Sequence, residues 1–91
     1  MANKVRWEKD AEDTLEKIVA QVPFLFRSKA RSSTIERANE YALEIGAASV
    51  TRNHVIIAVI LITPPAYRDG LRKQFEKHAI DVSMFEEFFS R

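Results

Sequence analysis

The sequence predicts an all-α fold, a small helical bundle of about four to five helices with the longest helix in the middle of the chain. Apolar residues recur at spacings of three and four along most of the 91 residues. Pro and Gly fall where such stretches would begin or end. A chain of this length, with 46% hydrophobic residues, builds one core, so residues 1–91 are predicted to form a single helical domain.

The first predicted helix spans residues 7–22. Acidic residues crowd its first turns, where they suit the positive end of the helix macrodipole. Its apolar positions recur every three or four residues and therefore share one face: Trp7, Ala11, Leu15, Ile18, Val19 and Val22.

The second predicted helix is the longest. Pro23 suits its first turn, and Gly46 suits the left-handed position that ends many helices. Residues 27–34 include weak helix formers, which permits a kink or a break there. The helical stripe consists of Phe24, Arg31, Ile35, Ala38, Ala42 and Ile45.

The third predicted helix contains the eight consecutive apolar residues Val55 to Ile62, with Thr51 placed to cap its N-terminus. Most of these residues are β-branched, so propensity alone would allow a buried strand. No other segment alternates convincingly between apolar and polar residues, and a lone strand would lack a pairing partner. The segment is therefore assigned to a helix.

Residues 63–91 form a helical extension. Pro64 and Pro65 end the third helix and start a fourth, with apolar positions at Tyr67, Leu71, Phe75, His78 and Ala79. Ser83 and Glu86 have the spacing of a capping box, which predicts a short terminal helix containing Met84, Phe85, Phe88 and Phe89. The chain shows no internal repeat or flexible linker.

Several kinds of chemistry have no residues to support them. The chain has no cysteine for thiolate catalysis, disulfides or cluster ligation. Gly46 and Gly70 are its only glycines, so no glycine-rich phosphate loop exists, and His54 and His78 lie too far apart for a short metal motif. We therefore predict no catalytic residue, no metal and no cofactor, and expect the chain not to be an enzyme.

Charge and hydropathy limit the partners and the location. A formal net charge of +1 is too balanced to attract nucleic acid or anionic lipid through overall charge, so any polyanion site must be local. The longest apolar run is far below the roughly 20 residues that cross a bilayer, and residues 1–6 lack the apolar stretch of a signal peptide. The sequence predicts a cytoplasmic protein without a membrane span.

Two sets of residues are candidates for binding. Phe24, Arg27, Lys29 and Arg31 combine an aromatic ring with three cations near a helix N-terminus, where a carboxylate or phosphate could dock. The alternative places Phe24 in the core and leaves the cations solvated.

The second set lies in the third predicted helix, which has no polar face. Val55, Val59 and Ile62 are interface candidates for a partner or a flat ligand. The alternative is a central core helix, over which the aromatic tail of the same chain closes.

The chain also resembles a known family. The resemblance rests on a V-P-F-x-x-R segment, residues 22–27, between a Trp-led acidic helix and the G-x-x-x-V-T step of residues 46–51. These features resemble the C-terminal helical domain of the B subunit of light-independent protochlorophyllide reductase, over residues 7–58. The spacings on either side of Pro23 are about one helical turn longer than in that family.

The resemblance implies a non-catalytic accessory module of chlorophyll biosynthesis and photosynthesis that contacts a protochlorophyllide-like tetrapyrrole or the reductase subunits. It implies that Arg27 and Arg31 contact a propionate. Two other hypotheses remain. One is a protein–protein interaction or homo-oligomerisation module that uses the third helix, and the other is a histone-like nucleic-acid-binding domain, against which the near-neutral charge argues.

Overall fold

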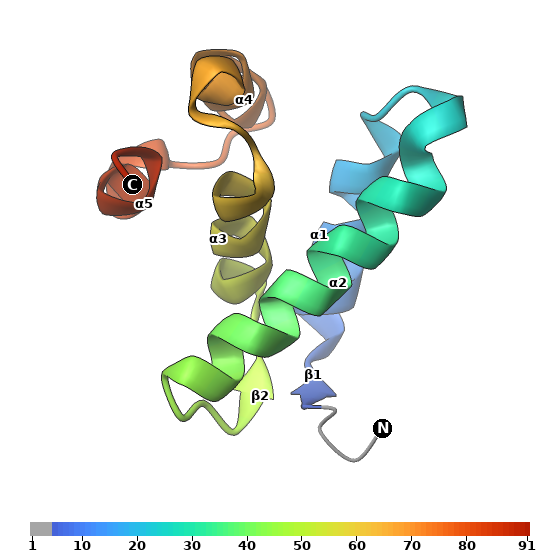
Figure 1. Cartoon of the computed structure of the whole chain (residues 1–91), viewed down its shortest axis with the longest axis vertical. Coiled ribbons are helices and arrows are strands. Elements are labelled where there is room, and N and C mark those ends of the chain that lie inside the picture. The colour runs from blue at the N-terminus through green and yellow to red at the C-terminus, as the bar shows by residue number, and fades with distance from the viewer. Residues whose placement is uncertain (1–4) are drawn as a thin grey trace.

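The computed structural model describes residues 5–91 and confirms the all-α fold with its longest helix in the middle (Figure 1). The α-helices are α1 (Lys9–Ala20), α2 (Arg27–Glu44), α3 (Arg52–Ile62), α4 (Arg68–Lys77) and α5 (Glu86–Phe89). Three 3-10 helices, η1 (Phe24–Phe26), η2 (Pro65–Tyr67) and η3 (Val82–Phe85), lie between them, and two short strands are β1 (Arg6–Trp7) and β2 (Ser49–Val50).

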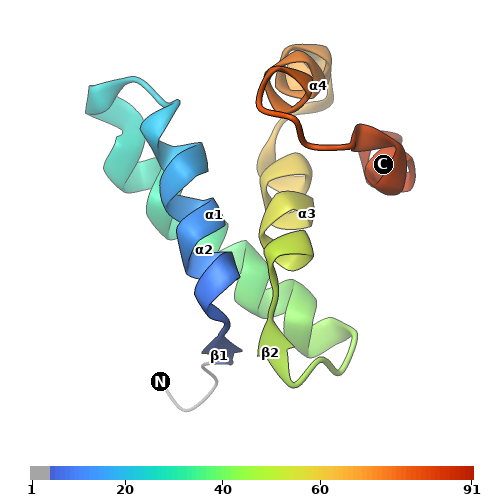
Figure 2. The same ribbon diagram turned by 180° about the vertical axis from the view of Figure 1, so that it is seen from behind.

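The helices form two arms. α1 and α2 run side by side as one arm, and α3 leads into the other, which carries α4 and α5 (Figures 1 and 2). The arms meet near β1 and β2 and diverge toward the end of the molecule where α4 lies. α3 packs against both α1 and α2 and also contacts α5, so it is the central helix.

The structure contains one small sheet that the sequence did not predict. β1 and β2 pair in parallel, with Trp7 opposite Val50, and the amide of Glu8 donates to the carbonyl of Val50 at 3.0 Å. Trp7 therefore precedes α1, and its indole nitrogen donates to Oδ1 of Asn39 on α2 at 2.8 Å. Two residues are too few to show alternation, so the sequence carried no strand signal here.

One half of the core joins the α1–α2 arm to α3. Alanines occupy much of the contact, which allows the helix backbones to approach closely. α2 is continuous through residues 27–34, so the permitted break is absent. The buried residues of this cluster are Ala11, Leu15, Val19, Ala38, Ala42, Val50, Val55 and Ala58.

The other half of the core lies between α3 and the C-terminal segment. The aromatic tail closes over α3, as one of the two sequence interpretations proposed, and the Phe75 and Phe89 rings meet edge to face with centroids 6.3 Å apart. The buried residues of this cluster are Ile56, Ile57, Val59, Ile60, Phe75, Phe85, Phe88 and Phe89. Burial on opposite sides thus explains why residues 55–60 of α3 are all apolar.

Local caps were predicted correctly at two places and wrongly at a third. Gly46 adopts a φ of 70° after α2, and the Thr51 side chain accepts from the amide of His54 at the start of α3. Near the C-terminus, Asp81 is the capping residue instead of Ser83, because its carboxylate accepts from both the amide and the hydroxyl of Ser83. An ionised carboxylate is the stronger acceptor.

The two helix corners are built alike, although the sequence predicted no internal repeat. Each consists of a Pro, a 3-10 helix ending in an aromatic residue, and an Arg that starts the next α-helix. The backbone angles of Phe26 (φ −108°, ψ 1°) and Tyr67 (φ −107°, ψ 2°) nearly coincide. In each corner the Arg donates from Nε to the carbonyl five residues earlier, Arg27 to Val22 at 2.7 Å and Arg68 to Thr63 at 3.0 Å.

The two corners differ in what covers them. Arg68 is only 8% exposed and donates a further hydrogen bond to the carbonyl of Phe89 on α5 at 3.3 Å. Arg27 is exposed, and its second hydrogen bond goes back to the carbonyl of Ala20 on α1 at 3.1 Å. The C-terminal segment therefore covers the second corner, while the first stays open.

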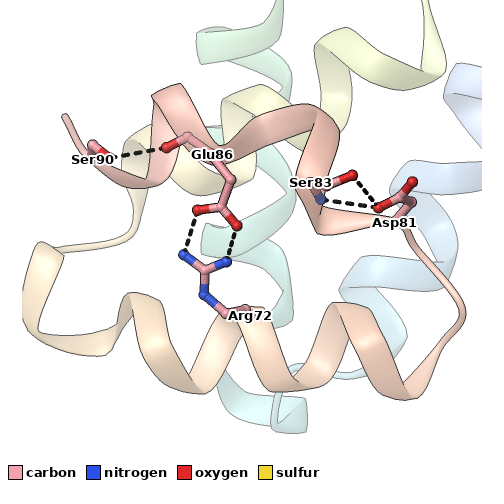
Figure 3. A network of polar contacts seen from close by, with 5 residues as sticks. All are labelled: Arg72, Asp81, Ser83, Glu86 and Ser90. Carbon is pink, nitrogen blue, oxygen red and sulfur yellow. Dashed lines mark hydrogen bonds and ion pairs between the residues drawn. The ribbon is translucent and has the colours of Figure 1, made fainter.

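An ion pair ties the C-terminal segment to α4 (Figure 3). The guanidinium of Arg72 donates to both carboxylate oxygens of Glu86, with 3.0 Å between Nη2 and Oε1, and stacks 4.4 Å from the centre of the Phe89 ring. Hydrogen bonding by Arg72 lowers the pKa of Glu86 below its ordinary 4.5. The bonds from Ser83 likewise lower the pKa of Asp81.

These shifts predict acid loosening of the C-terminal segment. A carboxyl whose pKa is lowered in the folded state stabilises the fold above its unfolded value, and this contribution is lost as the pH falls through the folded value. Amide exchange in α5 should therefore speed up as the pH drops below about 4.5, after correction for the intrinsic pH dependence of exchange. Glu86→Gln should exchange faster in α5 already at neutral pH.

Glu16→Gln is the matched control, because Arg31 lowers the pKa of Glu16 in the same way but on the other arm. It should leave α5 exchange unchanged relative to the rest of the chain. Equal effects of the two variants on α5 would contradict this assignment.

Candidate functional site

A cleft of about 760 Å³ lies between the two arms. The last turns of α1 and the first half of α2 form one wall, and α3, α4 and the residues just after α4 form the other. This volume lies within the range of small-molecule sites, which occur preferentially where helices or domains meet.

The walls of the cleft are mainly apolar. Phe75, which is buried in the core, also lines the cleft. Thr63 lines it too, but its hydroxyl donates a hydrogen bond to the carbonyl of Val59 at 2.6 Å. The aliphatic lining consists of Ile18, Val22, Val59, Ile62, Leu71 and Ile80. Apolar walls of this kind favour a ligand with a large hydrophobic surface.

The charged groups of the cleft are all basic. Lys17 on α1 and Arg52 on α3 line it from opposite walls, together with the imidazole of His78. None of the described Asp and Glu residues lines the cleft, although the chain has thirteen of them. Arg52 also lies in the first turn of α3, where the helix macrodipole adds positive potential. The cleft is therefore suited to an apolar molecule with an anionic group.

The structure does not gather the predicted residues Phe24, Arg27, Lys29 and Arg31 into a cleft. Phe24 points into solvent, so the alternative that placed it in the core was wrong. The guanidinium of Arg27 donates hydrogen bonds to two main-chain carbonyls, and Arg31 forms a bidentate ion pair with Glu16. These residues lie on the surface of the α1–α2 arm, whereas Ala30 and Thr34 are the α2 residues that line the cleft.

Val55, Val59 and Ile62, the interface candidates of α3, have different environments. Val55 and Val59 are buried inside the chain, where they belong to opposite halves of the core. Ile62 is 38% exposed and lines the cleft. The core interpretation therefore describes the first two residues, and Ile62 has exposed surface for a contact.

A second, more open hollow of about 510 Å³ is lined by residues of both α1 and α2 and by Trp7. Three of its lining residues are the carboxylates Glu12, Asp13 and Glu16, and the last is paired with Arg31. Within residues 5–91 no group of three or more His, Asp or Glu side chains is placed to hold a metal ion. No helix in that range is long and apolar enough to cross a membrane.

The basic residues of the cleft leave no pattern in the sequence. Lys17 and Arg52 lie 35 positions apart on different helices, and no spacing rule connects them. One local signal was available: the first turn of α3 has no acidic residue and carries Arg52, opposite to the usual preference at a helix N-terminus.

Comparison of the sequence with known protein families identifies one that the chain matches over nearly its whole length. A family model described as "Protein of unknown function (DUF2621)" matches residues 2–89. The chain belongs to the DUF2621 family. No curated protein and no solved structure matches the chain. The DUF2621 match includes every residue that lines the cleft, so the cleft lies wholly inside the family domain.

Proposed function

We propose that the chain is a non-catalytic binding module whose cleft holds an apolar molecule bearing carboxylates, and that a chlorophyll-precursor tetrapyrrole is its ligand class. The observation that carries the proposal is the charge of the cleft: Lys17 and Arg52 line apolar walls, and no described carboxylate lies among them. A macrocycle with propionates combines the two properties that such a cleft selects, a large apolar surface and an anionic edge.

Two features support the tetrapyrrole class within this proposal. The cleft volume of about 760 Å³ fits a large flat molecule better than a metabolite of a few atoms. The resemblance to the reductase B-subunit domain over residues 7–58 points to the same ligands, and this segment supplies Lys17 and Arg52. The two cations thereby replace Arg27 and Arg31 as the expected partners of a propionate.

Titration with protoporphyrin IX tests the proposal. The wild-type chain should shift the Soret band of the porphyrin saturably, and Lys17→Ala/Arg52→Ala should weaken binding by roughly tenfold for each cation removed, the size of one partly exposed charged contact. The dimethyl ester of the same porphyrin keeps the macrocycle but lacks the carboxylates. It should bind wild type as weakly as the acid binds the double variant.

Arg27→Ala/Arg31→Ala is the comparison variant, because it removes two cations from the same arm outside the cleft. It should bind the porphyrin nearly as well as wild type. Loss of binding in this variant alone would place the carboxylate at the arm surface instead. The absence of any Soret shift with wild type would reject the tetrapyrrole ligand.

The other function hypotheses have less support in the structure. Of the three residues predicted to form an oligomer interface on α3, Ile62 has exposed surface, whereas Val55 and Val59 are buried. A nucleic-acid surface would draw on Arg31 and Arg37, which make ion pairs with neighbouring glutamates. Each of these contacts would have to be broken before the cation could bind a phosphate.

A further inference from the structure

The turn between α1 and α2 exposes three large apolar side chains in succession. Phe24, Leu25 and Phe26 are 79%, 84% and 61% exposed, and no other part of the described chain covers them. Residues 23–26, here called the hairpin tip, lie at the far end of the α1–α2 arm, away from β1 and β2 (Figure 1). Such a patch marks an interaction surface in a protein of this size.

The charge around the hairpin tip is strongly one-sided. Between Lys17 and Ile35 the sequence has four Lys or Arg residues and no Asp or Glu, whereas the rest of the chain has ten Lys or Arg residues against thirteen Asp or Glu. Arg31 is paired with Glu16, which leaves the charges of Arg27 and Lys29 next to the apolar tip. The near-neutral net charge of the chain therefore conceals a local basic region.

We propose that the hairpin tip docks on the surface of an anionic lipid bilayer, with the Phe24–Phe26 side chains in the interface and the flanking cations at the headgroups. Exposed apolar side chains surrounded by Lys and Arg are the combination that binds peripheral proteins to such membranes. The contact is peripheral and needs no membrane-spanning helix.

The shape of the hairpin tip favours a bilayer over a protein groove. η1 is a 3-10 helix, in which successive side chains are about 120° apart, so the three side chains point in three directions. They cannot all face one surface of a folded partner. A fluid interface can surround all three at once.

Several main-chain polar groups of the hairpin tip are already hydrogen-bonded or absent, which suits a less polar environment. Pro23 has no amide hydrogen, and its carbonyl accepts from the amide of Phe26 at 2.9 Å. The guanidinium of Arg27 donates hydrogen bonds to the carbonyls of Ala20 and Val22 at the end of α1. Fewer free main-chain groups lower the cost of approaching the headgroup region.

Vesicle sedimentation tests the proposal on the full chain. Wild type should bind vesicles that contain phosphatidylglycerol at least tenfold more strongly than pure phosphatidylcholine vesicles, and added salt should reduce the difference. Phe24→Ser/Leu25→Ser/Phe26→Ser should lose at least tenfold of the binding to anionic vesicles. Lys29→Glu should weaken it severalfold while leaving the apolar side chains in place.

The matched control lies at the other end of α2. Leu43→Ser/Ile45→Ser removes two exposed apolar side chains about 27 Å from the hairpin tip and should bind anionic vesicles like wild type. Equal loss in this control, or wild type that fails to sediment with either vesicle, would overturn the proposal. Self-association on analytical ultracentrifugation that the triple Ser variant abolishes would instead make a second copy the occupant of the tip.

This test is independent of the porphyrin titration. The triple Ser variant and the Leu43/Ile45 control change no residue that lines the cleft, so each should bind protoporphyrin IX like wild type. Loss of membrane binding with retained porphyrin binding would separate the two surfaces.

Discussion

Arg68→Ala should lower the free energy of unfolding by about 3 kcal/mol, whereas Arg27→Ala should lower it by about 1 kcal/mol. The two residues occupy the same position in the two helix corners. Arg68 is buried and joins the carbonyl of Thr63 to that of Phe89, so its removal leaves both carbonyls without their donor inside the fold. Arg27 is exposed, and water can replace its hydrogen bonds.

Urea denaturation of the two variants under identical conditions measures this difference. The m-value should change little for Arg27→Ala, because the rest of the fold is unaffected. Similar losses for both variants would mean that the hydrogen bond to α5 contributes little and that the corner alone accounts for the effect. α5 protection from amide exchange should fall only in Arg68→Ala.

Ile60→Ala should lower the free energy of unfolding by about 2 to 5 kcal/mol, the usual cost of truncating a fully buried isoleucine to alanine and leaving a cavity. Ile60 is 0% exposed and packs in the cluster between α3 and the C-terminal phenylalanines. A domain of this size has roughly 5 to 14 kcal/mol of stability, so the variant should melt many degrees lower.

Ile62→Ala provides the control within the same helix. It deletes the same atoms from a side chain that is partly exposed in the cleft, and it should cost less than about 1 kcal/mol. Thermal unfolding followed by circular dichroism distinguishes the two. An Ile62→Ala loss as large as that of Ile60→Ala would show that the cleft wall is part of the cooperative core.

The features of the fold that depend on residues close together in the sequence, the helices and two of their caps, were predicted well. The spacing of apolar residues predicted the helices, and Gly46 and Thr51 were assigned correctly because a cap depends on one residue and its immediate neighbours. One of the two interpretations of the third helix had the aromatic tail close over it, since a helix with no polar face must be covered or leave an apolar patch, and the structure shows this cover.

The features that were missed depend on contacts between distant residues or on turn geometry. β1 and β2 are too short to leave a pattern, and the helix corners share only Pro, an aromatic residue and Arg at a separation of 41 positions. Phe24 follows a proline in a tight 3-10 turn, so helical periodicity could not indicate where its side chain points.

The candidate site could be predicted only in part. The sequence indicated an aromatic and basic segment near Pro23, and the structure places that segment on an exposed tip and arm surface. The cleft combines residues from four helices, and the positions of Lys17 and Arg52 across it depend on how the arms diverge. Such an arrangement is a property of tertiary packing and has no sequence spacing of its own.

The β1–β2 pair bears on the order in which the chain folds. Each of its residue pairs joins positions 43 apart, and closing a loop of that length costs about 3 kcal/mol of chain entropy. Two residue pairs cannot offset this cost until α1, α2 and α3 have already brought the strands together. The N-terminal strand is therefore expected to join the native structure last and to leave it first when the protein begins to unfold.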